Sequence, residues 1–210
     1  MAKKVSKVMA SAERSKQTSQ KLIDVAVDLF SRKGFKATSI REIANKMGMT
    51  TSNIYHHYGT KAGLLSAIEK NTLTPLIDEL RRIKKLDMPP LDRFVLLIKT
   101  HLRFMHTHRK ESKIFTFFEE ASTSGKEFQI ETYTIYRSEI QRLAESRDRE
   151  IDITVATMCT LGAVLWFLRW YRPDGRLSFE EVLDSISDYC LSGIIGDDKL
   201  DVKKTRALNS

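Results

Sequence analysis

The chain has 210 residues, of which 41% are hydrophobic and 30% charged, a composition that suits one large domain or two small ones and argues against a membrane protein. Its longest apolar run, residues 160–168, is about half of the ~20 residues that a membrane helix needs. The two cysteines are too few for a disulfide framework and indicate a reduced, cytoplasmic setting. The lysine-rich N-terminus has no apolar stretch behind it, so we expect no signal peptide.

The net charge of +8 is confined to the N-terminal part of the chain. Residues 1–61 carry 12 Lys and Arg against 4 Asp and Glu, whereas residues 62–210 carry 23 of each. A segregated excess indicates a polyanionic partner for one module, because neutralised phosphates release counterions and supply most of the non-specific affinity. We expect residues 1–16 to form a flexible basic arm and residues 17–61 to bind DNA.

Helical periodicity begins near Gln17 and ends at Gly34. A capping box that opens with Ser39 starts the next helix. Gly48 permits a tight turn after that helix, and Thr50 can cap the third one. Two short amphipathic helices joined by a glycine turn are typical of a helix-turn-helix, whose second helix enters the DNA major groove.

The remaining chain repeats the helical pattern and contains no strand-like alternation. Thr60 caps a helix that runs to about Leu86 with an expected kink at Pro75, and Met88 to Pro90 is a break. Further helices are predicted at about 91–107, 111–122, 126–146, 150–171 and 178–195. The fold class is therefore all-α, with a helical domain at 62–196 and a flexible tail at 197–210.

Polar side chains near the third helix are the candidates for DNA contacts. Asn bonds adenine in a bidentate manner, and Ser and Thr serve bases or phosphates. We expect base selectivity mainly at Thr51, Ser52 and Asn53, because phosphate contacts position a protein and base contacts specify the sequence. The full predicted set is Ser39, Arg41, Thr50, Thr51, Ser52, Asn53, Tyr55, His56 and Lys61.

Four segments in this region resemble TetR-family transcriptional regulators. They read AVDLF at 26–30, TSIREIA at 38–44, MGMT at 47–50 and IYHHY at 54–58. Tyr58 departs from the pattern, since Phe is commoner there. The resemblance implies a homodimer, a palindromic operator in double-stranded DNA and repression that a small-molecule effector relieves.

Two C-terminal helices are candidates for a dimer interface. The helix at 150–171 is apolar nearly all round, which indicates burial on most faces. Together with the broad apolar face of the helix at 178–195, it could build a four-helix bundle across a two-fold axis, which is where the family dimerises. The predicted interface residues are Cys159, Gly162, Ala163, Trp166, Leu183, Ile186 and Cys190.

A ligand pocket is predicted from rings and Met side chains at helical spacing, although such residues more often form plain core. The pocket would suit a long apolar ligand with one anionic or polar end. Its predicted residues are Phe94, Ile98, Met105, Phe115, Phe118, Tyr133, Tyr136, Arg137 and Arg169. The turn at 166–178 resembles that of a TetR subgroup that controls fatty-acid or sterol-ring catabolism and responds to acyl-coenzyme A, with Arg169, Arg172 and Arg176 as candidates for the coenzyme A phosphates.

Other functions find little support in the sequence. His101, His106 and His108 do not share one helical face, so we expect no metal site, and we expect no cofactor. No phosphate-cradling loop or nucleophile elbow indicates an enzyme. Two alternatives stay open: an architectural protein that binds DNA without sequence preference, and a helical enzyme.

Overall fold

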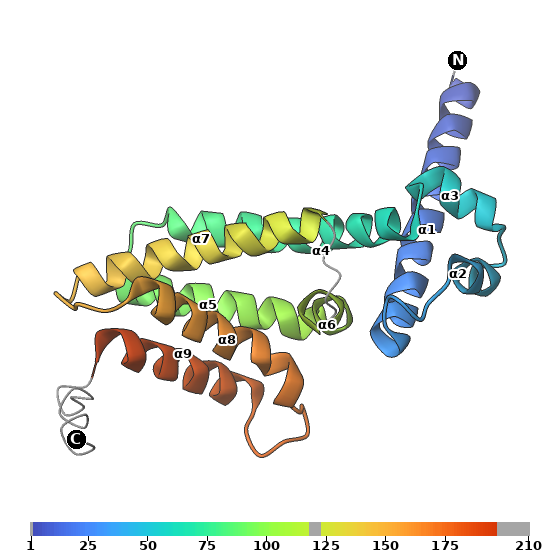
Figure 1. The fold of residues 1–210 in the computed structure, drawn as a ribbon. Coiled ribbons are helices and arrows are strands. Elements are labelled where there is room, and N and C mark those ends of the chain that lie inside the picture. The colour runs from blue at the N-terminus through green and yellow to red at the C-terminus, as the bar shows by residue number, and fades with distance from the viewer. Residues whose placement is uncertain (1, 118–122, 197–210) are drawn as a thin grey trace. The chain divides into compact units, whose positions relative to one another are not determined.

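The computed structural model describes residues 2–117 and 123–196, and within these ranges the chain forms nine helices and no strand. The predicted all-α class is therefore confirmed, while the predicted tail at 197–210 lies outside the described residues. In chain order the helices are α1 (Ala2–Lys33), α2 (Ile40–Met47), α3 (Thr51–Tyr58), α4 (Lys61–Lys84), α5 (Pro90–Thr107), α6 (Arg109–Phe117), α7 (Thr123–Glu145), α8 (Ile153–Trp170) and α9 (Phe179–Ile195) (Figure 1).

The first helix begins much earlier than the sequence pattern predicts. α1 starts at Ala2, whereas apolar periodicity begins near Gln17 and residues 1–16 were expected to form an arm. Residues 2–16 contain neither Gly nor Pro and consist largely of good helix formers such as Ala, Lys, Met, Glu and Arg. The described part of this segment is therefore helical, because helix propensity does not require an apolar face.

Local capping signals fix several other helix ends as predicted. The Thr60 hydroxyl accepts a hydrogen bond from the Gly63 nitrogen at 2.9 Å at the start of α4. A complete capping box opens α9, in which the Ser178 hydroxyl accepts from the Glu181 nitrogen and the Glu181 carboxylate accepts from the Ser178 nitrogen. These contacts satisfy N–H groups that have no partner within the helix.

The chain divides into two compact units. The N-terminal unit comprises residues 1–74 and 108–127, and the C-terminal unit comprises residues 75–107 and 128–210. The division falls inside α4 directly before Pro75, which lacks the N–H that an interior helical residue donates. By contacts, the first part of α4 and all of α6 therefore group with the N-terminal helices, whereas the sequence pattern places a boundary after Lys61.

The N-terminal unit is built around one apolar core. α1 packs against α2 and α6, and α2 packs against α3. Phe30, Ile43, Ile54 and Leu64 are at most 1% exposed in this core, to which α6 contributes Ile114. The buried positions of α2 and α3 hold the helix-turn-helix rigidly against α1.

The C-terminal unit is centred on α5, which packs against α8 and α9, while α8 and α9 pack against each other (Figure 1). A buried ion pair joins α5 to α7, with Arg93 Nε 2.5 Å from Glu139 Oε2. Arg93 Nη1 also donates to the carbonyl oxygens of Leu86 and Met88. The Glu139 side chain is fully buried, and its pairing with Arg93 offsets part of the free energy that is lost when a carboxylate leaves water.

Candidate nucleic-acid interface

The turn between α2 and α3 has the geometry that the sequence predicts. Gly48 adopts φ 64°, a left-handed conformation that costs glycine little, and its N–H donates to the carbonyl oxygens of Ala44 and Asn45. Ser39 caps α2, since its hydroxyl accepts from the Glu42 nitrogen at 3.1 Å. The Glu42 carboxylate pairs with Lys33 on α1, so the second half of the predicted capping box is replaced by a tertiary ion pair.

This geometry bears on two of the predicted DNA contacts. The Ser39 hydroxyl is engaged as a helix cap in the free protein. Thr50 takes the extended backbone of an N-cap residue but makes no side-chain capping bond, so its exposed hydroxyl is available to another partner. Arg41, on the first turn of α2, is exposed as well. Thr50 and Arg41 thus keep their polar ends at the surface beside α3.

α3 presents polar side chains on three flanks and buries a single residue, Ile54, which is 1% exposed. Residues four apart lie on one side of a helix. Ser52 and His56 form the row that points most directly away from Ile54, and both are exposed. Tyr55, half exposed, follows Thr51 on one flank.

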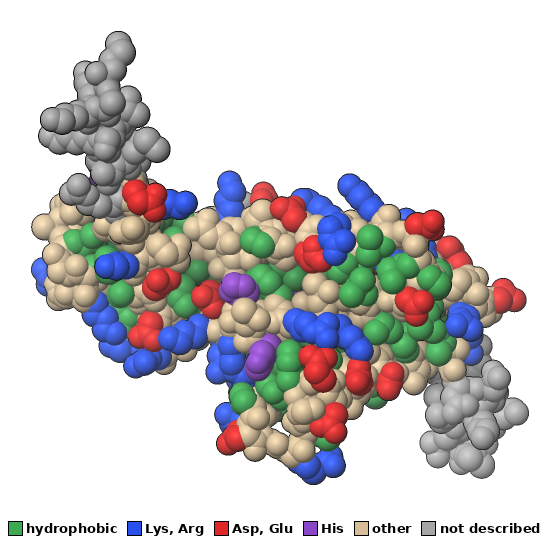
Figure 2. Space-filling view, turned by 180° about the vertical axis from the view of Figure 1, so that it is seen from behind, with side chains coloured by type: hydrophobic (Ala, Val, Ile, Leu, Met, Phe, Trp, Pro, Cys, Tyr) green, Lys and Arg blue, Asp and Glu red, His purple; other side chains and the backbone are tan. Residues whose placement is uncertain are grey.

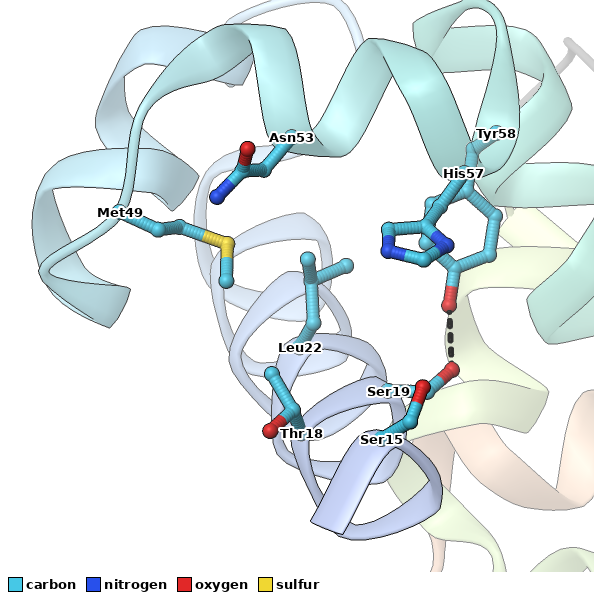
Figure 3. Close-up of a pocket in the computed structure, with 8 residues that line it drawn as sticks. All are labelled: Ser15, Thr18, Ser19, Leu22, Met49, Asn53, His57 and Tyr58. Atoms are coloured by element: carbon cyan, nitrogen blue, oxygen red, sulfur yellow. Dashed lines mark hydrogen bonds between the residues drawn. The ribbon is translucent and has the colours of Figure 1, made fainter. Parts of the chain in front are cut away.

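The third flank consists of Asn53 and His57, which are exposed and point from α3 toward α1 (Figure 3). There they line a shallow groove of about 170 Å³ with Ser15, Thr18, Ser19, Leu22, Met49 and Tyr58. The Tyr58 hydroxyl lies 2.8 Å from that of Ser19. His57 was not among the predicted contacts. The run of ring side chains at 55–58 is the sequence signal that could have identified it.

The Lys61 side chain is directed at backbone oxygens rather than at solvent. Its Nζ donates to the carbonyl oxygens of Phe35 and Thr38, both at 2.9 Å, and lies 4.4 Å from the centre of the Phe35 ring. These contacts close the loop between α1 and α2 onto the start of α4. In the free protein Lys61 therefore has a structural role, and its contact with DNA stays a prediction.

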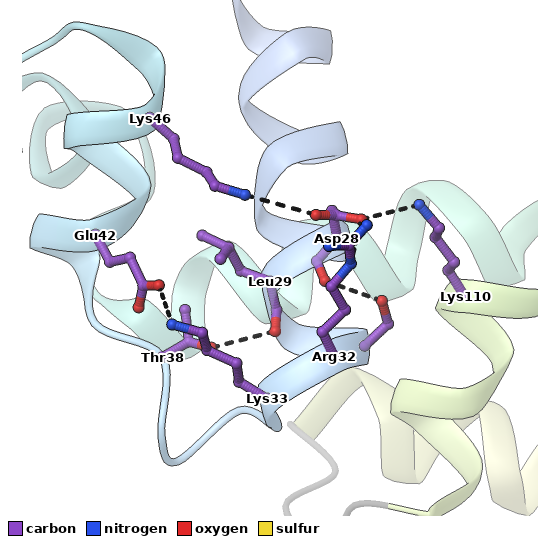
Figure 4. A network of polar contacts seen from close by, with 9 residues as sticks. Asp28, Leu29, Arg32, Lys33, Thr38, Glu42, Lys46 and Lys110 are labelled. Carbon is purple, nitrogen blue, oxygen red and sulfur yellow. Dashed lines mark hydrogen bonds and ion pairs between the residues drawn. The ribbon is translucent and has the colours of Figure 1, made fainter.

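A charge network joins α1, α2 and α6 (Figure 4). The Asp28 carboxylate accepts from Lys110 at 3.0 Å and is also paired with Arg32 at 3.2 Å and Lys46 at 3.7 Å. The hydrogen bond from Lys110, together with the charges of all three cations, lowers the pKa of Asp28 below its ordinary value of 3.8. The charge of Lys46 on α2 is thus partly neutralised within the protein.

The basic excess is visible on the surface of the N-terminal unit. Lys and Arg side chains gather along one edge of it, whereas acidic and basic side chains are interspersed on the C-terminal unit (Figure 2). A local excess of positive charge of this kind attracts nucleic acid. The exposed polar flanks of α3 therefore belong to the more basic part of the chain.

The structure brings together only part of the predicted ligand pocket. Phe94, Ile98, Met105 and Tyr136 are buried together with the core of the C-terminal unit. Tyr133 is half-buried, and Arg137 and Arg169 are exposed. Phe115 packs instead against the core of the N-terminal unit, because α6 turns this face toward α1. Phe118 lies outside the described residues.

Polar groups inside the C-terminal unit were not predicted from the sequence. His101 Nδ1 lies 3.1 Å from the Tyr136 hydroxyl, and both side chains are buried. Burial lowers the pKa of His101 to about 4 and raises the pKa of Tyr136 well above 10.0. Thr157, Thr160 and Ser187 are further buried polar residues of this unit.

The predicted dimer residues fall into two groups. Cys159, Gly162 and Trp166 are exposed on α8, and Ala163 is half-buried beside them. Leu183, Ile186 and Cys190 are buried within the chain, where this face of α9 packs against α5 and α8, so their place at a dimer interface stays a prediction. Burial also raises the pKa of the Cys190 thiol to about 11, which keeps it protonated and unreactive.

Further large apolar residues are exposed on the surfaces of α8 and α9. Val155, Met158 and Trp170 of α8 and Tyr189 of α9 are all at least 47% exposed. By length and composition alone α8 could cross a membrane, and 28% of it is buried within the chain. Since the buried side of α8 packs on α5 and α9, its exposed side is a surface that a partner protein can cover.

Comparisons with known proteins agree with this architecture. Residues 22–68 match the family model for bacterial regulatory proteins of the tetR family, and residues 87–194 match the tetracyclin repressor-like C-terminal domain. The HTH-type transcriptional repressor KstR2 of Rhodococcus jostii is 23% identical over 82% of this chain and 89% of its own length.

Solved structures show the same fold. The ketosteroid transcriptional regulator KstR2 of Mycobacterium tuberculosis has a TM-score of 0.75 at 20% identity, over 85% of this chain and 95% of its own. AibR in complex with isovaleryl coenzyme A and operator DNA has a TM-score of 0.70 at 22% identity, over 86% of this chain and 100% of its own. These relatives are transcriptional regulators rather than enzymes, and the chain, with its helix-turn-helix and its helical C-terminal domain, belongs to the TetR family of bacterial regulatory proteins.

Proposed function

We propose that the protein is a homodimeric repressor that binds a palindromic operator through α3 and leaves it when an effector binds the C-terminal unit. The observation that carries the proposal is the surface of α3. It buries Ile54 alone and offers polar side chains on all its other sides, as a helix that enters the major groove requires. Thr51, Ser52 and Asn53, at its N-terminal end, are the proposed base contacts.

A second copy of the chain is the proposed partner of the exposed side of α8. Met158 and Trp166 are 59% and 58% exposed there, and Tyr189 on α9 is 75% exposed. A Cβ added at Gly162 or Gly193 would meet nothing within 4 Å, so both positions leave room for another helix. A two-fold axis through this surface pairs the same patch on both subunits and favours a palindromic site. The two recognition helices would then lie about one DNA turn, ~34–36 Å, apart.

The proposed effector is an acyl-coenzyme A thioester. The proposal is supported by AibR, a neighbour in fold that was solved with isovaleryl coenzyme A. The apolar interior of the C-terminal unit suits an acyl chain, with His101 and Tyr136 as polar groups inside it. Arg169, Arg172 and Arg176 are exposed around the turn after α8 and are the proposed partners of the coenzyme A phosphates.

Effector binding would shift the population between two spacings of the recognition helices. α4 joins both units, and their division directly before Pro75 makes this residue the proposed point of adjustment. Crystal structures of the operator-bound and effector-bound dimers test this mechanism. Equal distances between the two copies of α3 in both states would contradict it.

Selection from a pool of random duplexes tests the DNA-binding proposal. We expect an inverted repeat to be enriched, and we expect Asn53→Ala to relax the preference at one base position of each half-site at a cost of ~1–3 kcal/mol. Enrichment of no sequence would instead favour architectural binding.

Two measurements test the proposed effector. Native mass spectrometry of the freshly purified protein looks for a bound ligand, and acyl-coenzyme A of graded chain length is then tested for release of the operator. Coenzyme A and the free fatty acids are its controls.

A further inference from the structure

The groove between α1 and α3 lies partly on a segment that the family match does not include. That match begins at Leu22, whereas α1 begins at Ala2. Ser15, Thr18 and Ser19 line the groove from this added length of helix, opposite Asn53 and His57 on α3 (Figure 3). Two independent parts of the chain thus present donors to one hollow beside the recognition helix.

We propose that this groove binds one deoxyribose-phosphate unit of the operator backbone, next to the bases that α3 reads. The inference rests on the proposed DNA-binding function and deepens it, since it assigns a second contact surface to the first helix. The fit follows from the two kinds of side chain in the groove. Met49, half-buried beside the almost fully buried Leu22, supplies apolar contact for the sugar carbons, and the hydroxyl and imidazole groups around them can donate to phosphate oxygens.

The size of the hollow favours this occupant. At about 170 Å³ it is smaller than the ~300–1,000 Å³ typical of pockets for drug-sized ligands. A single sugar-phosphate unit is smaller than a drug-sized ligand, and it is part of a duplex that α3 already binds. Lys16 and Lys21, both exposed on the same stretch of α1, add positive charge near the groove.

A hydrogen bond fixes the width of the groove. The Tyr58 hydroxyl lies 2.8 Å from the Ser19 hydroxyl, and the Tyr58 ring packs partly against the core of the N-terminal unit. Phenylalanine, the commoner residue of the family at this position, has no hydroxyl with which to make this bond. Tyr58 is therefore a positioning residue, which holds the hydroxyls of α1 at a set distance from Asn53 and His57.

The test replaces single phosphates of the selected operator with uncharged methylphosphonates and measures the dissociation constant for each duplex. The protein variant is Ser15→Ala combined with Thr18→Val, which removes two hydroxyls from the groove. Gln17→Ala is the matched control, because Gln17 is exposed on the same helix about half a turn away from Ser15. Circular dichroism and thermal unfolding check that both variants fold like the wild type.

We expect neutralisation of the contacted phosphate in one half-site to weaken wild-type binding about tenfold, the effect of losing one hydrogen bond to a charged group. Because the double variant changes both subunits of the dimer, it should bind the unmodified operator about a hundredfold more weakly, and it should be insensitive to that one modification alone. Tyr58→Phe should reduce the same sensitivity, and it provides the test if the double variant does not fold.

Two outcomes would overturn the inference. In one, the double variant binds the operator as tightly as the control does. In the other, it binds more weakly but keeps the wild-type sensitivity at every phosphate, which would indicate a structural role alone. Both outcomes leave the operator preference intact, whereas failure of the proposed function would appear as the absence of any preferred duplex.

Discussion

The Lys110 ammonium on α6 lies 3.0 Å from the Asp28 carboxylate on α1, and this bond attaches α6 to the N-terminal unit at its surface. Ile114, one turn further along α6, is 2% exposed in the core of the same unit. A buried apolar anchor and a surface ion pair thus act on one short helix. α6 is therefore part of the structure that supports the helix-turn-helix, although it follows α5 in the chain.

Asp28→Asn should lower the melting temperature of the protein at neutral pH, because the three cations around this position lose their charged partner. The pKa of Asp28 is lowered in the folded state, so its stabilising effect is present above the ordinary pKa of 3.8 and is lost as the pH falls through the folded value. Thermal unfolding from pH 7 downward should show the variant and the wild type converging below pH 3.8. Asp24→Asn is the control, since Asp24 accepts from Gln20 instead. A melting difference that persisted at low pH would contradict this account.

Lys61→Met should destabilise the protein by about 1–3 kcal/mol, the cost of leaving carbonyl groups without a donor. The carbonyl oxygens concerned are those of Phe35 and Thr38. Urea unfolding measures the loss, and Lys70→Met, at an exposed position of α4, is the control. Two results together would show instead that Lys61 contacts a phosphate and does not stabilise the fold. Stability would be unchanged, and the slope of log affinity against log salt concentration would fall by about one per subunit.

The buried His101 should make the protein sensitive to acid. Its pKa of about 4 in the folded state lies below the ordinary value of 6.5, so between these values the unfolded chain binds a proton that the folded chain does not. Stability should therefore fall as the pH is lowered through this window, by a total on the order of 3 kcal/mol.

The double variant His101→Phe with Tyr136→Phe removes both partners of the buried pair and should lose this pH dependence. Tyr136→Phe alone keeps the histidine and should retain it. The measurement is the free energy of unfolding in urea at pH 7, 6, 5 and 4. A double variant whose stability still fell in parallel with that of the wild type would show that other groups cause the effect.

Met158→Glu should separate the dimer into monomers, because it places a charge in the apolar surface that the second copy is proposed to cover. Sedimentation velocity at micromolar concentration measures the change, and operator affinity should fall with it. Ile130→Glu is a matched control, because Ile130 is 67% exposed on another helix, α7. Dissociation by the control, or an unchanged dimer in the Met158 variant, would argue against this surface.

Local signals made the helix-turn-helix predictable. Ser39 and Gly48 mark the ends of α2 through capping and backbone conformation, both of which act within a few residues. Ile40, Ile43 and Ala44 stand three and four residues apart, a helical spacing that marks the buried side of α2. Tertiary contacts were not accessible in this way: the carbonyl partners of Lys61 come from the loop between α1 and α2, more than twenty residues earlier.

The remaining differences have the same origin. Apolar periodicity cannot locate the start of a helix whose first turns do not carry the apolar pattern, so α1 was predicted to begin near Gln17 rather than at Ala2. A broad apolar helix does not reveal which side faces its own chain. Leu183 is therefore buried in the core of the subunit, whereas Tyr189 on the same helix is exposed.

The most direct test of the central claim, that the exposed flanks of α3 read a DNA sequence, compares two duplexes of equal length and composition. One carries the selected inverted repeat and the other a scrambled version, and fluorescence anisotropy measures both dissociation constants at physiological salt. We expect the protein to bind the repeat at least ~1,000-fold more tightly than the scrambled duplex. Equal affinity for the two duplexes would contradict it.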